Sequence, residues 1–275
     1  MSYASEETSA DNGSPVELYN FVYSGQSFFL TSSDTPISHL DHTFMPASIQ
    51  RPKVEGTSNV DKASIEITVA KNSPVAEIFR DGSPSEVVFV TIWSTHLTDS
   101  GAQFVVDWKG RLIDCNWEPD SATLTSENVF SSLLRSGLGP RFSVQCTVAL
   151  YSGACGVPRD SRKISTTVTA ITGLSLTVPV VADNPDNWFA GGLISWVNSV
   201  FGNTEWRSIR SSQKSTGIIT LPTNVRGLSV GQAIDIYPGC DHGLSTCDTK
   251  FNNAINYRGH PFIPAINPFG GNAIF

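Results

Sequence analysis

Short segments in which apolar and polar residues alternate run through the first half of the chain. Residues 18–23 and 27–31 carry this alternation on either side of a turn at 24–26, which predicts an antiparallel hairpin. Residues 64–69 alternate as cleanly, so one face of their strand should be buried and the other wet. Residues 87–93 are mostly apolar and β-branched, which predicts a strand of the core.

Two features of the first half differ from this simple pattern. Lys109-Gly110 stands between the strand-like runs 104–108 and 111–115, and such a pair predicts a two-residue hairpin turn. The best helix candidate is 126–137, where Ser126 can cap the start and Gly137 can end the helix. Its apolar face would consist of Val129, Phe130, Leu133 and Leu134.

The second half is also rich in strand-like segments. They cover 167–178, 188–196, 207–213, 217–221 and 233–237, and glycine or proline residues separate several of them. Close to the C-terminus, 248–256 predicts a short helix that carries Phe251 and Ile255 inward.

Strands at intervals of about ten residues with Gly/Pro turns are typical of all-β folds. We therefore predict a mainly β chain with two tube-like antiparallel β-barrel or sandwich modules, over 15–140 and 141–275. One or two short helices and a loop-rich, metal-bound C-terminal segment complete this prediction. Residues 1–14 are polar and acidic, which predicts a flexible tail.

Composition limits the function classes. The 275 residues are 40% hydrophobic and 16% charged, which is typical of a folded protein. The net charge is −7 and Lys and Arg form no cluster, which argues against a nucleic-acid-binding surface. The start of the chain has no signal-peptide pattern and the apolar runs are too short to span a membrane. We therefore expect synthesis in a reducing cytoplasm and no membrane insertion.

Four of the five cysteines form two pairs in loops. Eight residues separate Cys146 from Cys155, and six separate Cys240 from Cys247. Four thiolates can complete a tetrahedral zinc site or ligate a [4Fe–4S] cluster, and these spacings are wide for zinc. Two short-range disulfides or plain buried thiols are the alternatives, although a reducing cytoplasm weakens the disulfides. The fifth cysteine, Cys115, lies on a predicted strand and is expected to be a small buried hydrophobe.

Catalytic and receptor-binding alternatives have weaker support in the residues. Cys240 precedes Asp241 and His242, which are residue types of a cysteine hydrolase, but neighbours on one turn rarely face each other in catalytic geometry. The six Trp that could form a carbohydrate- or receptor-binding platform are spread along the chain, as core residues are. Gly191-Gly192 lacks a following Lys-Ser/Thr and indicates close strand packing, not a phosphate loop.

The residues around the cysteines resemble a known family. The motifs that carry the resemblance are Trp188-Phe189-Ala190-Gly191-Gly192, Gly239-Cys240-Asp241, Cys247, Lys250-Phe251-Asn252, Asn256-Tyr257-Arg258-Gly259, Pro261 and Pro264, with Cys146 and Cys155 upstream in the same order. They are similar to the C-terminal signature of the BR0599-type phage proteins, which supply tail-tip or baseplate hubs of long-tailed phages and gene transfer agents. This chain departs from the pattern at His242, where the family usually has Lys, and at Tyr257, where Phe is common.

The resemblance implies a structural virion protein and not an enzyme. It implies a homotrimeric hub around the tail axis that joins the distal tail protein to the central tip or receptor-binding fibre protein. The tape measure protein, a tail-associated peptidase and the passing DNA would be further partners, and the hub would be assembled in the host cytoplasm. Since the cysteine spacings also resemble those of lambda-type tail tip proteins, it implies a [4Fe–4S] cluster on Cys146, Cys155, Cys240 and Cys247. His242 leaves a mixed Cys/His site open, and a tail-associated enzyme that depends on cysteine or iron–sulfur chemistry is the alternative function.

Overall fold

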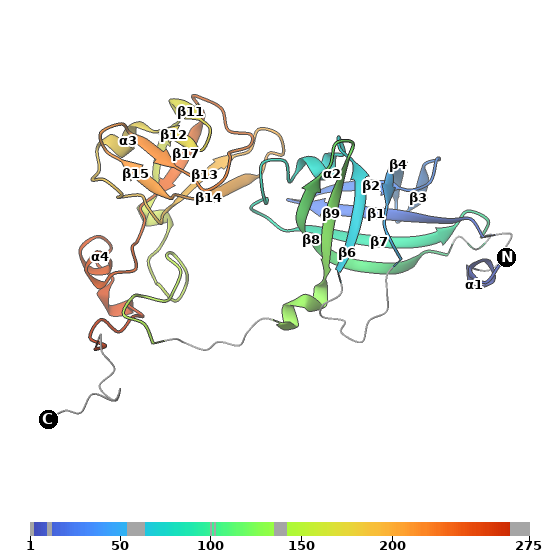
Figure 1. Cartoon of the computed structure of the whole chain (residues 1–275), viewed down its shortest axis with the longest axis horizontal. Helices are drawn as coiled ribbons and strands as arrows, with labels where there is room; N and C mark the ends of the chain where they lie inside the picture. Colours follow the sequence, from blue (N-terminus) through green and yellow to red (C-terminus); the bar gives the residue numbers. More distant parts are fainter. Residues whose placement is uncertain are drawn as a thin grey trace. The chain divides into compact units, whose positions relative to one another are not determined.

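In the computed structural model the chain folds mainly into β-strands with a few short helices, as the alternating pattern predicts (Figure 1). The structure describes residues 3–9, 13–53, 64–99, 101, 103–134 and 142–264. The chain divides into two units, Met1–Ser136 and Gly137–Phe275. The domain border predicted between 140 and 141 lies outside the described residues.

Within the described residues, the first unit contains a sheet of nine strands in the order β3-β4-β2-β1-β7-β8-β9-β6-β5. The elements of this unit are α1 (Tyr3–Glu7), β1 (Pro15–Tyr23), β2 (Gln26–Thr31), β3 (Ile37–His39), β4 (His42–Pro46), β5 (Ile49–Gln50), β6 (Ser64–Ala70), α2 (Pro74–Glu77), β7 (Val88–His96), β8 (Val105–Trp117), β9 (Ser121–Asn128) and the 3-10 helix η2 (Val129–Leu134). The β1–β2 hairpin, β6 and β7 confirm the strands predicted from alternation.

The sheet is open, which corrects the predicted barrel. Its edge strands β3 and β5 have three and two residues and do not pair with each other. Short edge strands expose few unpaired backbone groups, and this limits unwanted strand addition. Alternation reports which face of each strand is buried but not whether the two ends of a sheet meet, so it could not decide between an open sheet and a barrel.

The predicted hairpin turn at Lys109-Gly110 is wrong. Both residues lie inside β8, where Gly110 pairs with Val90 of β7 and with Asn128 of β9. A Cβ atom on Gly110 would lie 2.3 Å from the carbonyl oxygen of Glu127, so the strand needs glycine here for close packing.

The predicted helix over 126–137 is replaced by a strand end and a 3-10 helix. Ser126 caps nothing because it is a buried residue of β9, and its Oγ accepts a hydrogen bond from Nε1 of Trp108 at 2.9 Å. η2 begins at Val129, and Val129 and Phe130 are exposed instead of forming a buried apolar face. The predicted end at Gly137 lies outside the described residues.

Part of the predicted flexible tail is ordered. Residues 3–7 form α1, which packs against β7. The hydroxyl of Tyr3 is 2.7 Å from Oγ of Ser94, and the Tyr3 ring meets His96 edge-on with centroids 5.2 Å apart. The acidic composition of this segment did not indicate these contacts because they depend on single side chains.

The second unit contains two four-stranded sheets within the described residues, β10-β17-β13-β14 and β11-β12-β16-β15. Its elements are the 3-10 helix η3 (Asp160–Arg162), β10 (Ile164–Thr167), β11 (Ala170–Thr172), β12 (Ser175–Thr177), α3 (Pro179–Ala182), β13 (Leu193–Val197), β14 (Thr204–Ser208), β15 (Ser211–Gln213), β16 (Ile218–Thr220), β17 (Ala233–Tyr237), α4 (Leu244–Thr249) and the 3-10 helix η4 (Ala254–Asn256).

Both sheets of the second unit share one hydrophobic core. Leu176 and Ile219 enter it from one sheet, and Ile194 and Ile236 enter it from the other. The two sheets are open at their edges, so this unit is not a closed barrel either. No helix among the described residues is both long and apolar enough to cross a membrane.

Candidate metal centre

Two loops outside the sheets of the second unit carry the four paired cysteines. Cys146 and Cys155 precede β10, whereas Cys240 follows β17 and Cys247 lies in α4. All four cysteines line one pocket, which has about 360 Å³ of space including its open mouth. All five cysteines of the chain are free thiols. Folding therefore brings together two pairs that are about ninety residues apart in sequence, and Cys115 lies on β8 of the other unit.

The backbone of His242 connects the Cys146 loop to the Cys240 loop. Its carbonyl oxygen accepts a hydrogen bond from the backbone N–H of Cys146 at 2.9 Å. Its own N–H donates to Sγ of Cys240 at 3.3 Å. The φ angle of His242 is 63°, a left-handed conformation that is uncommon outside glycine and turns the chain sharply between these two bonds. The same carbonyl also accepts the hydroxyl of Tyr257 at 3.2 Å.

Asn253 connects the other two cysteines in the same way. Its side-chain Nδ2 donates to the carbonyl oxygen of Cys155 at 2.7 Å, and its backbone N–H donates to that of Cys247 at 2.9 Å. The thiol of Cys247 donates to the Asn253 carbonyl oxygen at 3.3 Å. Asn253 is buried, so the loss of one of these hydrogen bonds would leave a buried polar group unpaired and would destabilise the fold.

Apolar side chains form the wall of the pocket. Cys155, Val157 and Phe251 are buried in one small cluster, and Val148 and Leu150 pack against it. Phe251 is buried, as predicted, but it lies between α4 and η4, so the single helix predicted over 248–256 is wrong.

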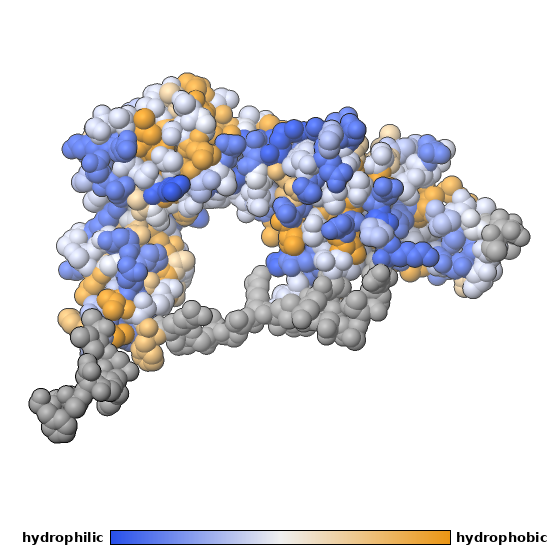
Figure 2. All heavy atoms as spheres, in the orientation of Figure 1, coloured by the Kyte–Doolittle hydropathy of each residue, from blue (hydrophilic) through white to orange (hydrophobic). Residues whose placement is uncertain are grey.

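Ile255 was predicted to point inward and does not. It is 94% exposed, and Phe142 and Phe262 of the neighbouring segments are 83% and 91% exposed. Figure 2 shows hydrophobic residues on the surface of this part of the second unit. A break at Asn252, whose φ is 50°, separates α4 from η4, so the helical period used for the prediction does not continue to Ile255.

Glycines allow the Cys240 loop to lie directly on the loop before β13. A Cβ atom on Gly239 would lie 1.7 Å from the Ala190 carbonyl oxygen, and one on Gly192 would lie 2.1 Å from that of Tyr237. Gly191 has a φ of 74°, and a Cβ atom there would meet the Cys240 carbonyl oxygen at 2.7 Å. These contacts confirm that Gly191-Gly192 serves close packing.

Lys250 fastens the same loop from the α4 side. Its Nζ donates to the carbonyl oxygen of Gly239 at 2.7 Å and to that of Trp188, and lies 4.1 Å from the centre of the Trp188 ring. Burial lowers the pKa of Lys250 to about 8, while the nearby Cys240 and Asp241 act in the opposite direction. Lys250 therefore places a positive charge beside the thiols.

Burial opposes ionisation of the thiols themselves. It raises the pKa of the Cys240 thiol, which the His242 N–H partly counteracts. It also raises the pKa of the Cys247 thiol, and the neighbouring cysteines raise that pKa further. Buried thiols that lie close together can act as metal ligands, because a bound cation stabilises their thiolate forms and its binding releases their protons.

The donor set decides which inorganic group fits. Four sulfur donors without a carboxylate suit soft metals and iron–sulfur clusters. Sulfur atoms around one tetrahedral zinc stand about 4 Å apart, and among the described residues no three His, Cys, Asp or Glu side chains are placed to hold one ion. A [4Fe–4S] cube is larger than one ion and is ligated at separate corners. Four cysteines that line one pocket supply the ligand number of either group.

Sequence reasoning missed Asn253. The neighbouring Asn252 and Asn256 were noted as part of a motif, but the asparagine that contacts the cysteines lies between them. Several asparagines in one loop indicate hydrogen bonds between their side chains and the nearby backbone, and this loop has three of them. It could not tell which asparagine reaches a cysteine that is almost a hundred residues away.

Comparisons with known proteins cover both units. The family model for a "Baseplate hub protein, N-terminal attachment domain" matches residues 20–158. The model for "Phage conserved hypothetical protein BR0599" matches residues 187–267, the region of Cys240 and Cys247. The solved structure of the virion of a native gene transfer agent (GTA) particle contains a chain with a TM-score of 0.73 and 20% identity. That match covers 99% of this chain and 97% of the other, and it shows a shared fold.

A curated relative has a longer chain. An uncharacterized protein of Xylella fastidiosa (strain 9a5c) is 26% identical over an alignment of 163 residues, and the match covers 55% of this chain and 34% of the relative. The chain thus matches about a third of the length of that relative.

Proposed function

Because this chain belongs to the family of baseplate hub proteins that share an N-terminal attachment domain, we propose that it is the tail-tip hub of a long-tailed phage or gene transfer agent. It is a structural protein of the virion, located in the tail baseplate. The family model covers residues 20–158, half of the 275 residues, and a second phage model covers 187–267. A structural family supports a role other than catalysis.

The hub would act as a connector between rings. In this proposal three copies surround the tail axis and join the distal tail protein above to the central tip or receptor-binding fibre protein below. The end of the tape measure protein and the DNA pass through the lumen, and a tail-associated peptidase is a further neighbour. The net charge of −7 is compatible with a channel that DNA passes without binding.

The second part of the proposal is a structural [4Fe–4S] cluster on Cys146, Cys155, Cys240 and Cys247. The observation that carries it is the convergence of all four thiols on one pocket. The cluster fastens the loop-rich C-terminal segment to the sheets of the second unit. Apart from Phe251, this segment buries little apolar surface, so its own packing stabilises it weakly.

Convergence also argues against the enzymatic alternative. A cysteine peptidase needs one nucleophilic thiol and a base, and the other three thiols would have no role. His242 lines the pocket, but the contacts that hold it there are made by its backbone.

Single cysteine variants test the cluster. The full chain is purified without oxygen, and iron, zinc and acid-labile sulfide are measured together with the absorption spectrum. We expect brown protein that contains iron and sulfide for the wild type and for Cys115→Ser, the matched control. Each of Cys146→Ser, Cys155→Ser, Cys240→Ser and Cys247→Ser should give colourless protein. Zinc without sulfide in the wild type would replace the cluster by a single ion.

Assembly in the host tests the hub itself. We expect a phage or transfer-agent particle with one of these four variants to form defective tail tips, seen by electron microscopy, whereas Cys115→Ser forms normal ones. Normal, infectious particles from all four variants would remove the structural role of the centre. Tails that form normally when the whole gene is deleted would overturn the hub assignment.

A further inference from the structure

A groove in the first unit combines a charged network with an unpartnered buried carboxylate. The groove has about 1,670 Å³ of space including its open part and is lined by α1, the start of β1, residues 49–53, the end of β7 and Asp107 of β8. We call it the α1 groove. Nothing in the cysteine centre depends on it, because the groove lies within the first unit.

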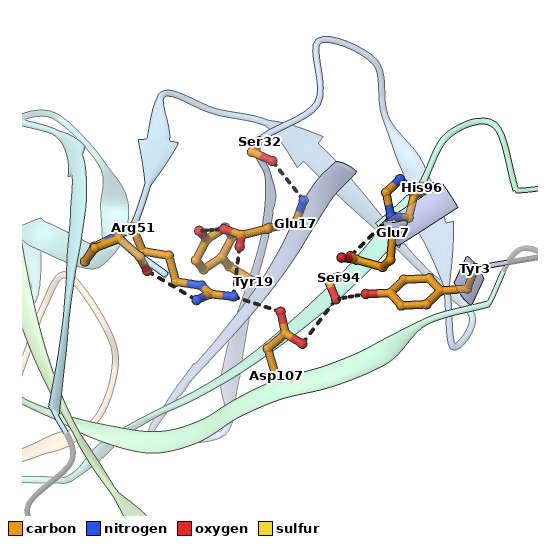
Figure 3. A network of polar contacts seen from close by, with 10 residues as sticks. Tyr3, Glu7, Glu17, Tyr19, Ser32, Arg51, Ser94, His96 and Asp107 are labelled. Carbon is orange, nitrogen blue, oxygen red and sulfur yellow. Dashed lines mark hydrogen bonds and ion pairs between the residues drawn. The ribbon is translucent and has the colours of Figure 1, made fainter. Parts of the chain in front are cut away.

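Arg51 organises one end of the α1 groove (Figure 3). Its side chain is only 4% exposed, and its guanidinium forms ion pairs with Glu17 and Asp107, each at 2.8 Å. Tyr19 donates its hydroxyl to Glu17, and Ser94 donates to Asp107 at 3.1 Å. Each oxygen of these two carboxylates therefore has a partner within this chain.

His96 and Glu7 pair at the other end. Nε2 of His96 lies 3.3 Å from Oε1 of Glu7, as the close view shows (Figure 3). This pair occupies Glu7 but leaves Nδ1 of His96 buried without a hydrogen bond. One ring nitrogen of the lining therefore has no hydrogen-bond partner in the described part of the chain.

Glu6 is the carboxylate that the chain leaves without a partner. It is 1% exposed, lines the α1 groove, and neither of its oxygen atoms has a hydrogen-bond partner in the described part of the chain. Nε of Arg51 and Nδ1 of His96, in the same lining, are also buried without a partner. Buried polar groups are nearly always paired, so three such residues in one groove indicate groups that a ligand completes.

The charges of the lining indicate the sign of that ligand. Four carboxylates, those of Glu6, Glu7, Glu17 and Asp107, face the full positive charges of Arg51 and Lys53. A cationic group that donates hydrogen bonds would satisfy Glu6 and balance the excess negative charge. A metal ion is a poor candidate, since no three possible ligands converge among the described residues.

We infer that the α1 groove binds a lysine- or arginine-bearing segment of a partner polypeptide, with Glu6 as the counter-ion of the basic side chain. A polypeptide supplies what the lining lacks: an ammonium or guanidinium donor for Glu6, a carbonyl acceptor for Arg51 Nε, and a backbone N–H for His96 Nδ1, which accepts because Nε2 donates to the Glu7 carboxylate.

Peptide binding to the full chain tests the inference. The probes are the blocked peptide Gly-Ser-Arg-Ser-Gly and the same peptide with citrulline, which keeps the shape of arginine and removes its charge. We expect saturable binding of the arginine peptide at low salt by calorimetry and NMR, with the citrulline peptide about tenfold weaker or more. Equal binding of the two peptides, or no binding of the arginine peptide, would overturn the cationic site.

Variants locate the site. We expect Glu6→Gln to weaken binding of the arginine peptide about tenfold or more, because it removes one charge and keeps the shape. Glu66→Gln is the matched control, since Glu66 is exposed on β6 outside the groove, and it should bind as the wild type does. Unchanged binding by Glu6→Gln would refute the inference.

A stability measurement separates a binding residue from a structural one. An unpartnered buried carboxylate destabilises the free protein, so Glu6→Gln should leave the urea midpoint unchanged or raise it in the absence of peptide. A lowered midpoint would show that the Glu6 charge already has a structural partner, and the inference would fail. Success or failure here does not affect the cluster or the hub assignment, which rest on other residues.

Discussion

The side-chain amide of Asn253 donates to the carbonyl oxygen of Cys155 at 2.7 Å, although 97 residues separate the two in sequence. The backbone of the same asparagine pairs with Cys247. One residue of the C-terminal segment therefore fixes a cysteine from each loop, and the backbone of His242 does the same for Cys146 and Cys240. The two clamps together place four thiols around one pocket.

Loss of the Asn253 side chain should loosen the C-terminal segment. Asn253→Ala leaves the buried Cys155 carbonyl without its donor, which costs about 1–3 kcal/mol. We expect faster amide hydrogen exchange at residues 244–257 and lower iron content after purification. Asn116→Ala, at an exposed position of β8, is the control and should change neither. Equal exchange rates in both variants would show that the clamp is dispensable.

A methyl group on Gly239 should prevent the Cys240 loop from docking. The Cβ atom of Gly239→Ala would overlap the Ala190 carbonyl oxygen, and a backbone group cannot rotate away as a side chain can. We expect Gly239→Ala to lower the thermal midpoint by several degrees. The cysteines of the pocket should then react with a thiol reagent in the native protein. Gly153→Ala is the matched control from the other cysteine loop, because a Cβ atom there meets nothing within 4 Å. The prediction fails if both variants melt together.

Removal of the Lys250 ammonium should also loosen the Cys240 loop, in this case without introducing a steric clash. Lys250→Met keeps the length of the side chain and loses the hydrogen bonds to the carbonyls of Trp188 and Gly239. Hydrogen bonds to charged groups contribute about 1.5–3 kcal/mol each, so α4 should open more often. Limited proteolysis of the metal-free protein would then cut near residues 238–243 first. The exposed Lys214→Met should be cut at the wild-type rate.

Cys115 should make the first unit less stable in alkali. Burial, with a contribution from Asp114, raises the pKa of Cys115 from 9.0 to about 11 in the folded chain. Between about pH 9 and about pH 11 the folded state holds a proton that the unfolded state has lost, so stability falls as the pH rises through this window. Cys115→Ala should remove part of the fall in urea unfolding between about pH 8 and about pH 10.5. An identical alkaline fall in the variant would contradict the prediction.

Strands could be predicted wherever alternation and burial agree. Residues 64–69 and 233–237 follow the pattern and form β6 and β17 almost residue for residue. Lys109-Gly110 misled because a glycine beside a polar residue is a turn signal in local terms. The need for glycine at position 110 comes from a non-local contact, the close approach of Glu127 from β9. No local pattern contains that distance.

The four cysteines could be grouped from sequence, but the residues that join them could not. Spacing and motif singled out Cys146, Cys155, Cys240 and Cys247, and the structure brings them to one pocket. The inward position predicted for Ile255 assumed a continuous helix, and the left-handed Asn252 interrupts it. Long-range contacts by a single amide have no periodicity, so they leave no trace in the pattern of the chain.

The backbone contacts of His242 have a consequence for sequence divergence. Both bonds that tie Cys146 to Cys240 come from main-chain atoms of this residue, and neither uses the imidazole. A substitution at position 242 should therefore preserve these bonds as long as the new residue adopts the same backbone dihedral angles, whatever the chemistry of its side chain. Glycine or asparagine, which adopt left-handed φ angles readily, should therefore replace His242 without loss of either bond.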